Sequence, residues 1–218
     1  MIIDHTHYQY RRRRELLSEA QRHNGAYYYS REIVKNIIPL VETDRNWITI
    51  NIQGVGVDHS IVFIHNNLHP ENYDWLKYHG YKDLVLVCGI KETCEKVAHL
   101  GTAIYLPLSI DVDYVQQFRT NNHTKKAAFA GRRSKANAEK LPADIDYLCG
   151  MKRPQLLAAM AEYKQIYAVG RTAIEARALG CTIKAYDERF PDPRRWKVVD
   201  NKDAAKMLQK QLDRIDKR

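Results

Sequence analysis

Short apolar stretches alternate with amphipathic ones along most of the chain, in the rhythm of an α/β protein. The continuous apolar run 61–64 has the composition of a strand buried on both faces of a parallel sheet, and 83–88 is interpreted as a second buried strand. We expect strands at 26–29, 47–52, 61–64, 83–88, 103–106, 127–130, 146–149, 165–169 and 182–186. Between them the apolar spacing predicts helices at 11–23, 31–41, 71–79, 91–100, 134–140, 154–163, 172–179 and 203–215.

Strands that alternate with helices of this length predict parallel sheets whose faces are covered. The chain has 218 residues, enough for two small cores. The segment 107–111 looks like a crossing between two halves of similar length. We therefore expect an α/β fold with two Rossmann-like parallel-sheet halves facing across a cleft, one made by residues 1–108 and the other by residues 109–218.

Composition limits the class of protein. Apolar residues make up 44% of the chain, as in ordinary globular proteins, and no apolar run approaches the ~20 residues that span a bilayer. A cytoplasmic protein without membrane insertion is therefore expected. None of the four cysteines forms a CxxC pair, so we expect reduced thiols and no metal site. The net charge of +9 favours phosphates, nucleotides or nucleic acid as partners without choosing among them, and a scattered surplus is also common on solvated surfaces.

Polar and basic residues follow four of the predicted strands directly. Because ligands of parallel sheets bind at the carboxyl ends of strands, these positions are candidates for a binding site. The four segments are His65-Asn66-Asn67, Gly131-Arg132-Arg133, Gly150-Met151-Lys152-Arg153 and Gly170-Arg171-Thr172.

The stretch 163–186 contains the most informative of these segments. It is interpreted as strand, glycine turn, short helix, glycine stop and second strand. The turn would leave free N–H groups at the helix start, with Thr172 available to cap them and Arg171 beside them, which is an arrangement that attracts phosphate. Glu175, one turn further on, would then lie near sugar or ribose hydroxyls. The same pattern is also ordinary α/β connectivity in which Gly180 only ends a helix.

The second half resembles the donor-binding domain of GT-B glycosyltransferases of the retaining, nucleotide-sugar-using type. The resemblance covers roughly 105–186 and depends on four segments in the right order. They are the interdomain segment 104–111, the strand–Gly–Arg–Lys loop 129–135, the turn Leu148-Cys149-Gly150, and the Glu-Ala segment 170–176 followed by Gly180.

The resemblance implies residue roles. Arg132 and Lys135 would bind the diphosphate of the donor, with Arg133 as an alternative to Arg132, and Thr172 would also touch phosphate. Glu175 would bind the ribose or the donor sugar, and His65 would act near the reacting sugar; a structural or solvated histidine is the alternative. The backbone of Gly131, Gly150, Met151, Gly170 and Arg171 would complete the donor site.

The implied function is transfer of a sugar from a nucleotide-diphosphate sugar to an unidentified acceptor, without a metal. Nucleic acid, such as a modified base in viral DNA, is one acceptor that the basic surplus suggests. The chain departs from the family at Ala168, where a second acidic residue is common, and its first half is short. These departures keep two alternatives open: a non-catalytic nucleotide- or phosphosugar-binding module, and a basic nucleic-acid-binding protein on the same fold.

Overall fold

The computed structural model describes residues 1–3, 25–49, 56–65 and 70–217 and has an α/β fold with two parallel sheets. These residues form two compact units, each described by itself below. The first holds the described residues of 1–17, 26–107 and 201–218, and the second holds 108–200 together with Gly25. The first unit thus ends at Pro107 and takes up the chain again from Asn201, so residues 201–217 belong to it.

A sheet of five parallel strands forms the centre of the first unit, in the order β1-β2-β3-β4-β5. The strands are β1 (Ile2–Ile3), β2 (Asn46–Ile48), β3 (Ser60–Ile64), β4 (Leu84–Cys88) and β5 (Thr102–Tyr105). Every residue of β3 and β4 is buried, as their continuous apolar sequences predict for central parallel strands. The two-residue strand β1 was not predicted.

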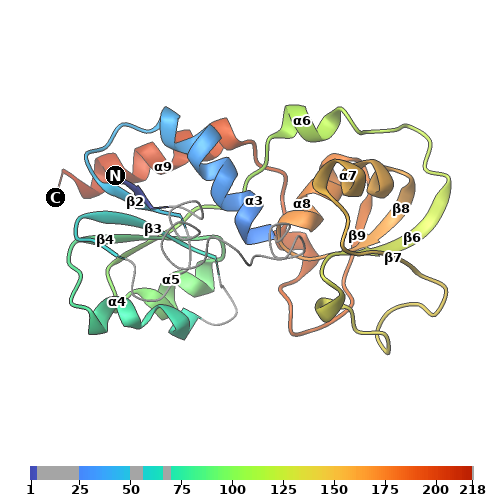
Figure 1. The fold of residues 1–218 in the computed structure, drawn as a ribbon, viewed down its shortest axis with the longest axis horizontal. Helices are drawn as coiled ribbons and strands as arrows, with labels where there is room; N and C mark the ends of the chain where they lie inside the picture. Colours follow the sequence, from blue (N-terminus) through green and yellow to red (C-terminus); the bar gives the residue numbers. More distant parts are fainter. Residues whose placement is uncertain (4–24, 50–55, 66–69, 218) are drawn as a thin grey trace, which may run out of the picture. The chain divides into compact units, whose positions relative to one another are not determined.

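Helices lie on both faces of this sheet (Figure 1). One face carries α3 (Gly25–Glu32), a π-helical segment (Ile33–Ile37), a 3₁₀ turn (Ile38–Leu40) and α9 (Asn201–Ile215). The other face carries a 3₁₀ turn (Pro70–Tyr73), α4 (Trp75–Tyr78) and α5 (Lys91–Val97). The core on this second face includes Tyr73, Leu76, Leu86 and Val97, all with essentially no exposed surface.

The strand predicted at 26–29 is wrong, because these residues belong to α3. Tyr29 packs edge-on against Phe63 of β3, with 6.4 Å between ring centroids. The Ser30 hydroxyl lies 2.8 Å from the Thr49 hydroxyl. Packing against the sheet therefore decides the conformation of a tyrosine run whose composition also suits a strand. The predicted helix 11–23 lies outside the described residues.

A sheet of four parallel strands forms the centre of the second unit, in the order β7-β6-β8-β9. The strands are β6 (Lys125–Ala130), β7 (Asp146–Leu148), β8 (Tyr163–Tyr167) and β9 (Thr182–Lys184). Two helices, α7 (Arg153–Ala161) and α8 (Arg171–Ala178), lie on the same side of this sheet (Figure 1). Helix α6 (Val112–Gln116) packs against α8.

Irregular chain covers the other face of the second sheet. Phe129 and Val169 point to this face and pack with Leu141, Ile145 and Tyr186 from loops. The helix predicted at 134–140 is wrong: a 3₁₀ turn (Arg133–Lys135) is followed by bends and turns. The Asn137 side chain accepts a bond from the Glu139 N–H at 3.3 Å, a local contact that competes with helix formation.

Candidate functional site

Three strands of the second sheet end in a glycine with positive φ. The φ angles are 152° at Gly131 after β6, 71° at Gly150 after β7 and 61° at Gly170 after β8. A side chain added at Gly150 or Gly170 would meet nothing within 4 Å, so the backbone conformation rather than crowding accounts for glycine there. All three turns lie at the carboxyl edge, because the strands are parallel.

The strand order places two of these turns beside a topological switch point. From β6 the chain passes to β7 on one side, and it then returns across β6 to β8 on the other side. In sheets wound this way the crevice between the first and third strands is where ligands bind. The loop 131–135 follows β6 and the turn 170–172 follows β8, so these two predicted phosphate segments flank that crevice.

The loop after β6 carries three cations with different surroundings. Arg132 and Arg133 are exposed, and the Arg133 guanidinium lies 4.4 Å from the centroid of the Tyr147 ring. The Lys135 ammonium is partly buried, 5.6 Å from the centroid of Phe190, and has no ion pair with a described carboxylate. Burial lowers the Lys135 pKa, and the Arg132 charge lowers it further. An anion placed between these side chains would relieve both effects.

Replacing Lys135 with methionine is expected to stabilise the protein while weakening anion binding. The partly buried charge costs free energy that an apolar side chain of similar length does not, so we expect a gain of about 0.5–1 kcal/mol in urea unfolding. Lys164→Met is the control, because Lys164 is exposed on β8 and its replacement should change stability by less than about 0.5 kcal/mol. A loss of stability in Lys135→Met would show that the ammonium has a favourable partner in the fold.

Helix α8 begins at Arg171 with Gly170 at its cap position, and no side chain caps it. The N–H groups of Ala173 and Ile174 both donate to the Gly170 carbonyl, at 3.1 and 3.2 Å. The expectation that Thr172 caps the helix is therefore wrong, because Thr172 lies inside the first turn. A helix start without a side-chain cap presents the positive end of its dipole, which attracts an anion.

Glu175 is buried in α8 and holds two arginines. Its Oε1 accepts a bond from Nε of Arg171 at 3.0 Å and another from Nε of Arg153 at 3.0 Å. Arg153 begins α7, and its guanidinium lies 5.2 Å from the centroid of the Tyr114 ring in α6. The carboxylate predicted to bind ribose or sugar thus joins the first turns of α7 and α8. Its contact with a ligand stays a prediction.

The turn after β7 provides backbone rather than side-chain contacts. Gly150 and Met151 lead directly into α7, with Lys152 at the cap position and Pro154 in the first turn. No side chain caps this helix either. The predicted donor-binding role of Gly150 and Met151 therefore concerns backbone groups at a second helix start on the same edge.

His65 follows β3 in the first unit and is held by three neighbours. Its Nε2 lies 2.5 Å from the Thr49 carbonyl oxygen, and its backbone N–H donates to the Tyr73 hydroxyl at 2.7 Å. Its ring also meets Tyr29 edge-on, with centroids 5.6 Å apart. The donor bond to a carbonyl fixes the ring orientation, and the catalytic role of His65 stays a prediction. Asn66 and Asn67 lie outside the described residues.

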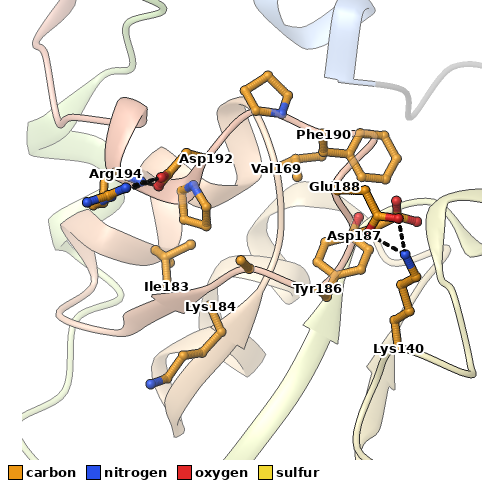
Figure 2. A pocket seen from close by; sticks show the side chains of 13 residues that line it. Lys140, Val169, Ile183, Lys184, Tyr186, Asp187, Glu188, Phe190, Asp192 and Arg194 are labelled. Carbon is orange, nitrogen blue, oxygen red and sulfur yellow. Dashed lines mark hydrogen bonds and ion pairs between the residues drawn. The ribbon is translucent and has the colours of Figure 1, made fainter.

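A cavity of about 820 Å³ opens beside these loops and was not predicted (Figure 2). The end of β9 and the chain that follows it, residues 183–194, arch around it, and Val169 and Lys140 complete the lining. Val169 directly precedes the cap of α8, and Phe190 is the ring that Lys135 approaches, so the cavity adjoins the phosphate segments. A loop with two prolines and three acidic residues directly after the last strand was the signal that could have indicated it.

Each carboxylate of the cavity lining is engaged by a basic side chain. Glu188 pairs with Lys140, and Asp192 pairs with Arg194 at 2.6 Å (Figure 2). Asp187 pairs with Arg189 at 2.6 Å. The Arg194 bond lowers the Asp192 pKa to about 2, and the Arg189 bond lowers the Asp187 pKa well below its usual range. The lining thus contains three carboxylates and three cations, and Lys184 is the lining cation without an ion pair to a described carboxylate.

Tyr186 carries a buried hydroxyl without a hydrogen-bond partner in the described part of the chain. The ring packs edge-on against Phe129 and also contacts Phe190, with centroids 5.5 and 5.6 Å away. Burial raises the pKa of Tyr186 to about 12, so the hydroxyl stays protonated. A buried donor of this kind costs about 1–3 kcal/mol unless a ligand or water satisfies it.

Tyr186→Phe is therefore expected to leave stability unchanged or raise it by up to about 1 kcal/mol, because it removes an unsatisfied group and keeps the ring. The matched control is Tyr163→Phe, since the Tyr163 hydroxyl donates to Asp146 at 2.9 Å. That variant should lose about 0.5–1.5 kcal/mol in the same denaturation experiment. Equal losses in both variants would mean that the Tyr186 hydroxyl is bonded in solution.

No group of three or more metal-ligating side chains occurs within residues 1–3, 25–49, 56–65 and 70–217. In the same residues, no helix is both long and apolar enough to cross a membrane. Comparisons with protein-family models, curated proteins and solved structures returned no significant match. A function for this chain is therefore inferred from its own geometry.

Proposed function

We propose that the chain is a glycosyltransferase that uses a nucleotide-diphosphate sugar, with the second unit as its donor-binding side. The observation that carries the proposal is the pair of loops beside the switch point, where uncapped helix α8 faces a loop with three cations. A diphosphate is the part of a donor that such an arrangement suits, since helix N–H groups and guanidinium forks both bind phosphate oxygens.

In this mechanism the protein stabilises the leaving diphosphate. Arg132 offers two parallel donors to phosphate oxygens and Lys135 offers a mobile point charge, with Arg133 as an alternative to Arg132. The first turn of α8 adds N–H donors at Arg171 and Thr172. Together they would offset the negative charge that develops as the sugar departs, which is the role that a divalent metal fills in other folds.

The proposal includes the finer architecture that the family resemblance implies: two Rossmann-like halves facing across a cleft, with His65 acting from the first half. The acceptor is unidentified. Nucleic acid, including a modified base of viral DNA, fits the net charge of +9. A base in a duplex would have to be reached in the groove or flipped out.

A second candidate is a nucleotide- or phosphosugar-binding module without catalysis. Glu175 favours it, because this residue is 4% exposed and its Oε1 accepts bonds from two arginines of its own unit. The usual partner position holds Ala168, which is also buried. In this arrangement Oε1 of Glu175 is engaged by arginines, and position 168 has no carboxylate.

A thermal-shift screen tests whether the chain binds a nucleotide, which both candidates require. UDP, GDP, ADP, TDP and CDP and their sugars would be tested against wild type, Arg132→Ala and the control Lys164→Ala. A true ligand at 100 times its Kd should stabilise wild type and the control by about 2.7 kcal/mol. It should stabilise Arg132→Ala far less.

The stabilising donor would then be assayed for hydrolysis and for transfer to a panel of acceptors, with and without excess chelator. Turnover in chelator supports the glycosyltransferase. Binding without hydrolysis or transfer supports the binding module. No stabilisation by any nucleotide at millimolar concentration would contradict both.

A further inference from the structure

Four cations form a slowly winding row along the solvent side of α9. Lys202, Lys206, Lys210 and Arg214 recur every fourth residue, and all four are exposed. Successive members rise by about 6 Å and the row is about 18 Å long. Like charges four residues apart destabilise a helix by about 0.2–0.5 kcal/mol per pair, so this row does not serve the stability of α9.

The acidic residues of α9 offset this row only in part. Asp216, just beyond the end of α9, is bound to Arg45 of the first unit at 2.9 Å, whereas Asp213 keeps its charge because its 2.8 Å bond is with the neutral amide of Gln209. Asp203 meets Lys206 at 3.5 Å, a distance typical of a weak surface pair. Lys210 and Arg214 make no ion pair with a described carboxylate, so their charges are directed to solvent.

The neighbouring helical segment extends the same charge. Helix α9 packs against the segment Ile33–Ile37, and α3 runs beside α9 in Figure 1. Arg31 of α3 and Lys35 of the π-helical segment are both exposed and again lie four residues apart. This helical face of the first unit thus carries six exposed cations on three elements, namely α3, the π-helical segment and α9.

We propose that this face, defined as Arg31, Lys35, Lys202, Lys206, Lys210 and Arg214, binds the phosphate backbone of duplex DNA. A duplex presents a regular line of charges, and a row about 18 Å long spans about five base pairs. An anionic membrane is a poorer match, because a helix lying in a bilayer surface inserts its apolar face. The apolar face of α9, with Ala204, Ala205, Leu208 and Leu212, is buried in the core of the first unit.

This inference does not depend on the proposed sugar transfer, since the face and the donor loops belong to different units. If both the sugar transfer and the duplex binding are correct, this face is where a DNA acceptor binds. Backbone contacts of this kind are independent of base sequence, so binding should be similar for unrelated duplexes of equal length.

The experiment measures binding of the full chain to a fluorescent 20-base-pair duplex between 50 and 200 mM salt. The test variant is Lys206→Ala/Lys210→Ala/Arg214→Ala. The control is Lys77→Ala/Lys82→Ala/Lys96→Ala, which removes the same charge from exposed sites elsewhere in the first unit. Loss of three phosphate contacts should lower the slope of log K against log salt by about 2.7, so wild-type affinity should fall about 40-fold more across this range than that of the test variant.

The control should keep the wild-type slope, and both variants should unfold at the wild-type denaturant midpoint. Three results would overturn the proposal: no binding of the duplex at 50 mM salt, equal loss of slope in both variants, or binding of anionic phosphatidylserine vesicles or polyglutamate in place of DNA. Loss of nucleotide binding in Arg132→Ala with unchanged duplex binding would be consistent with the duplex-binding proposal. Each of the two proposals can therefore be contradicted without the other.

Discussion

Replacing Glu175 with alanine is expected to lower the free energy of unfolding by about 3–5 kcal/mol. The reason is that the side chains of Glu175 and Arg171 are 5% and 8% exposed, and that of Arg153 is 13% exposed. Removing the carboxylate leaves two largely buried guanidinium groups without the oxygen that both Nε atoms bind, and an uncompensated buried charge is costly. Urea denaturation of the purified protein measures the effect.

Glu175→Gln is the informative control, because the amide oxygen can still accept both bonds although the charge is gone. It should lose clearly less than the alanine variant. If Glu175→Ala instead keeps wild-type stability and loses nucleotide affinity, the carboxylate is a ligand-binding residue, as the family resemblance implies. The stability measurement therefore distinguishes a structural from a functional role for this residue.

Replacing Leu208 with alanine is expected to lower the free energy of unfolding by about 2–5 kcal/mol and to destabilise the first unit. Leu208 has no exposed surface and belongs to the buried face of α9, and a Leu→Ala change at such a position loses apolar burial and leaves a cavity. Hydrogen exchange shows where the effect falls. Amides of β3 and β4 should lose protection, because α9 packs on that unit.

Leu157→Ala in α7 is the matched control, with the same chemistry at a residue that also has no exposed surface. It should reduce protection in β6 and β8, against which α7 packs. If Leu208→Ala reduced protection in β6 and β8 instead, α9 would belong with the second half, as the division at 108/109 predicts.

The central strands could be predicted because the apolar residues that identify them are consecutive in the sequence. Residues 61–64 and 84–88 are apolar at every position, and a run of this kind suits only a strand covered on both faces. The carboxyl-edge turns could be predicted for the same reason, since a glycine after an apolar strand marks a sharp change of chain direction. The positive φ at Gly131, Gly150 and Gly170 agrees with that prediction.

What could not be predicted depends on contacts between residues distant in sequence. Tyr29 is helical because Phe63 and His65 pack against it. The Oε1 atom of Glu175 accepts bonds from both Arg171 and Arg153, and Arg153 lies 22 residues earlier in the sequence. No pattern of neighbouring residues in the sequence predicts either contact. The cavity beside β9 likewise depends on how the loop 183–194 closes on Val169 and Lys140.

The way the chain enters and leaves the second unit has a mechanical consequence. Ile110 and Asp200 form a parallel bridge, and the Ile110 N–H donates to the Val199 carbonyl at 3.1 Å. The two ends of the segment 108–200 are thus clamped together, while β1 and α9 place both termini of the described chain in the first unit. Tension applied to the termini in an optical trap should therefore unfold the first unit first. The second unit should carry no load until the bonds between Ile110 and residues 199–200 break. The same clamp makes 107/108 and 200/201 suitable points for excising the segment or for permuting the gene around it.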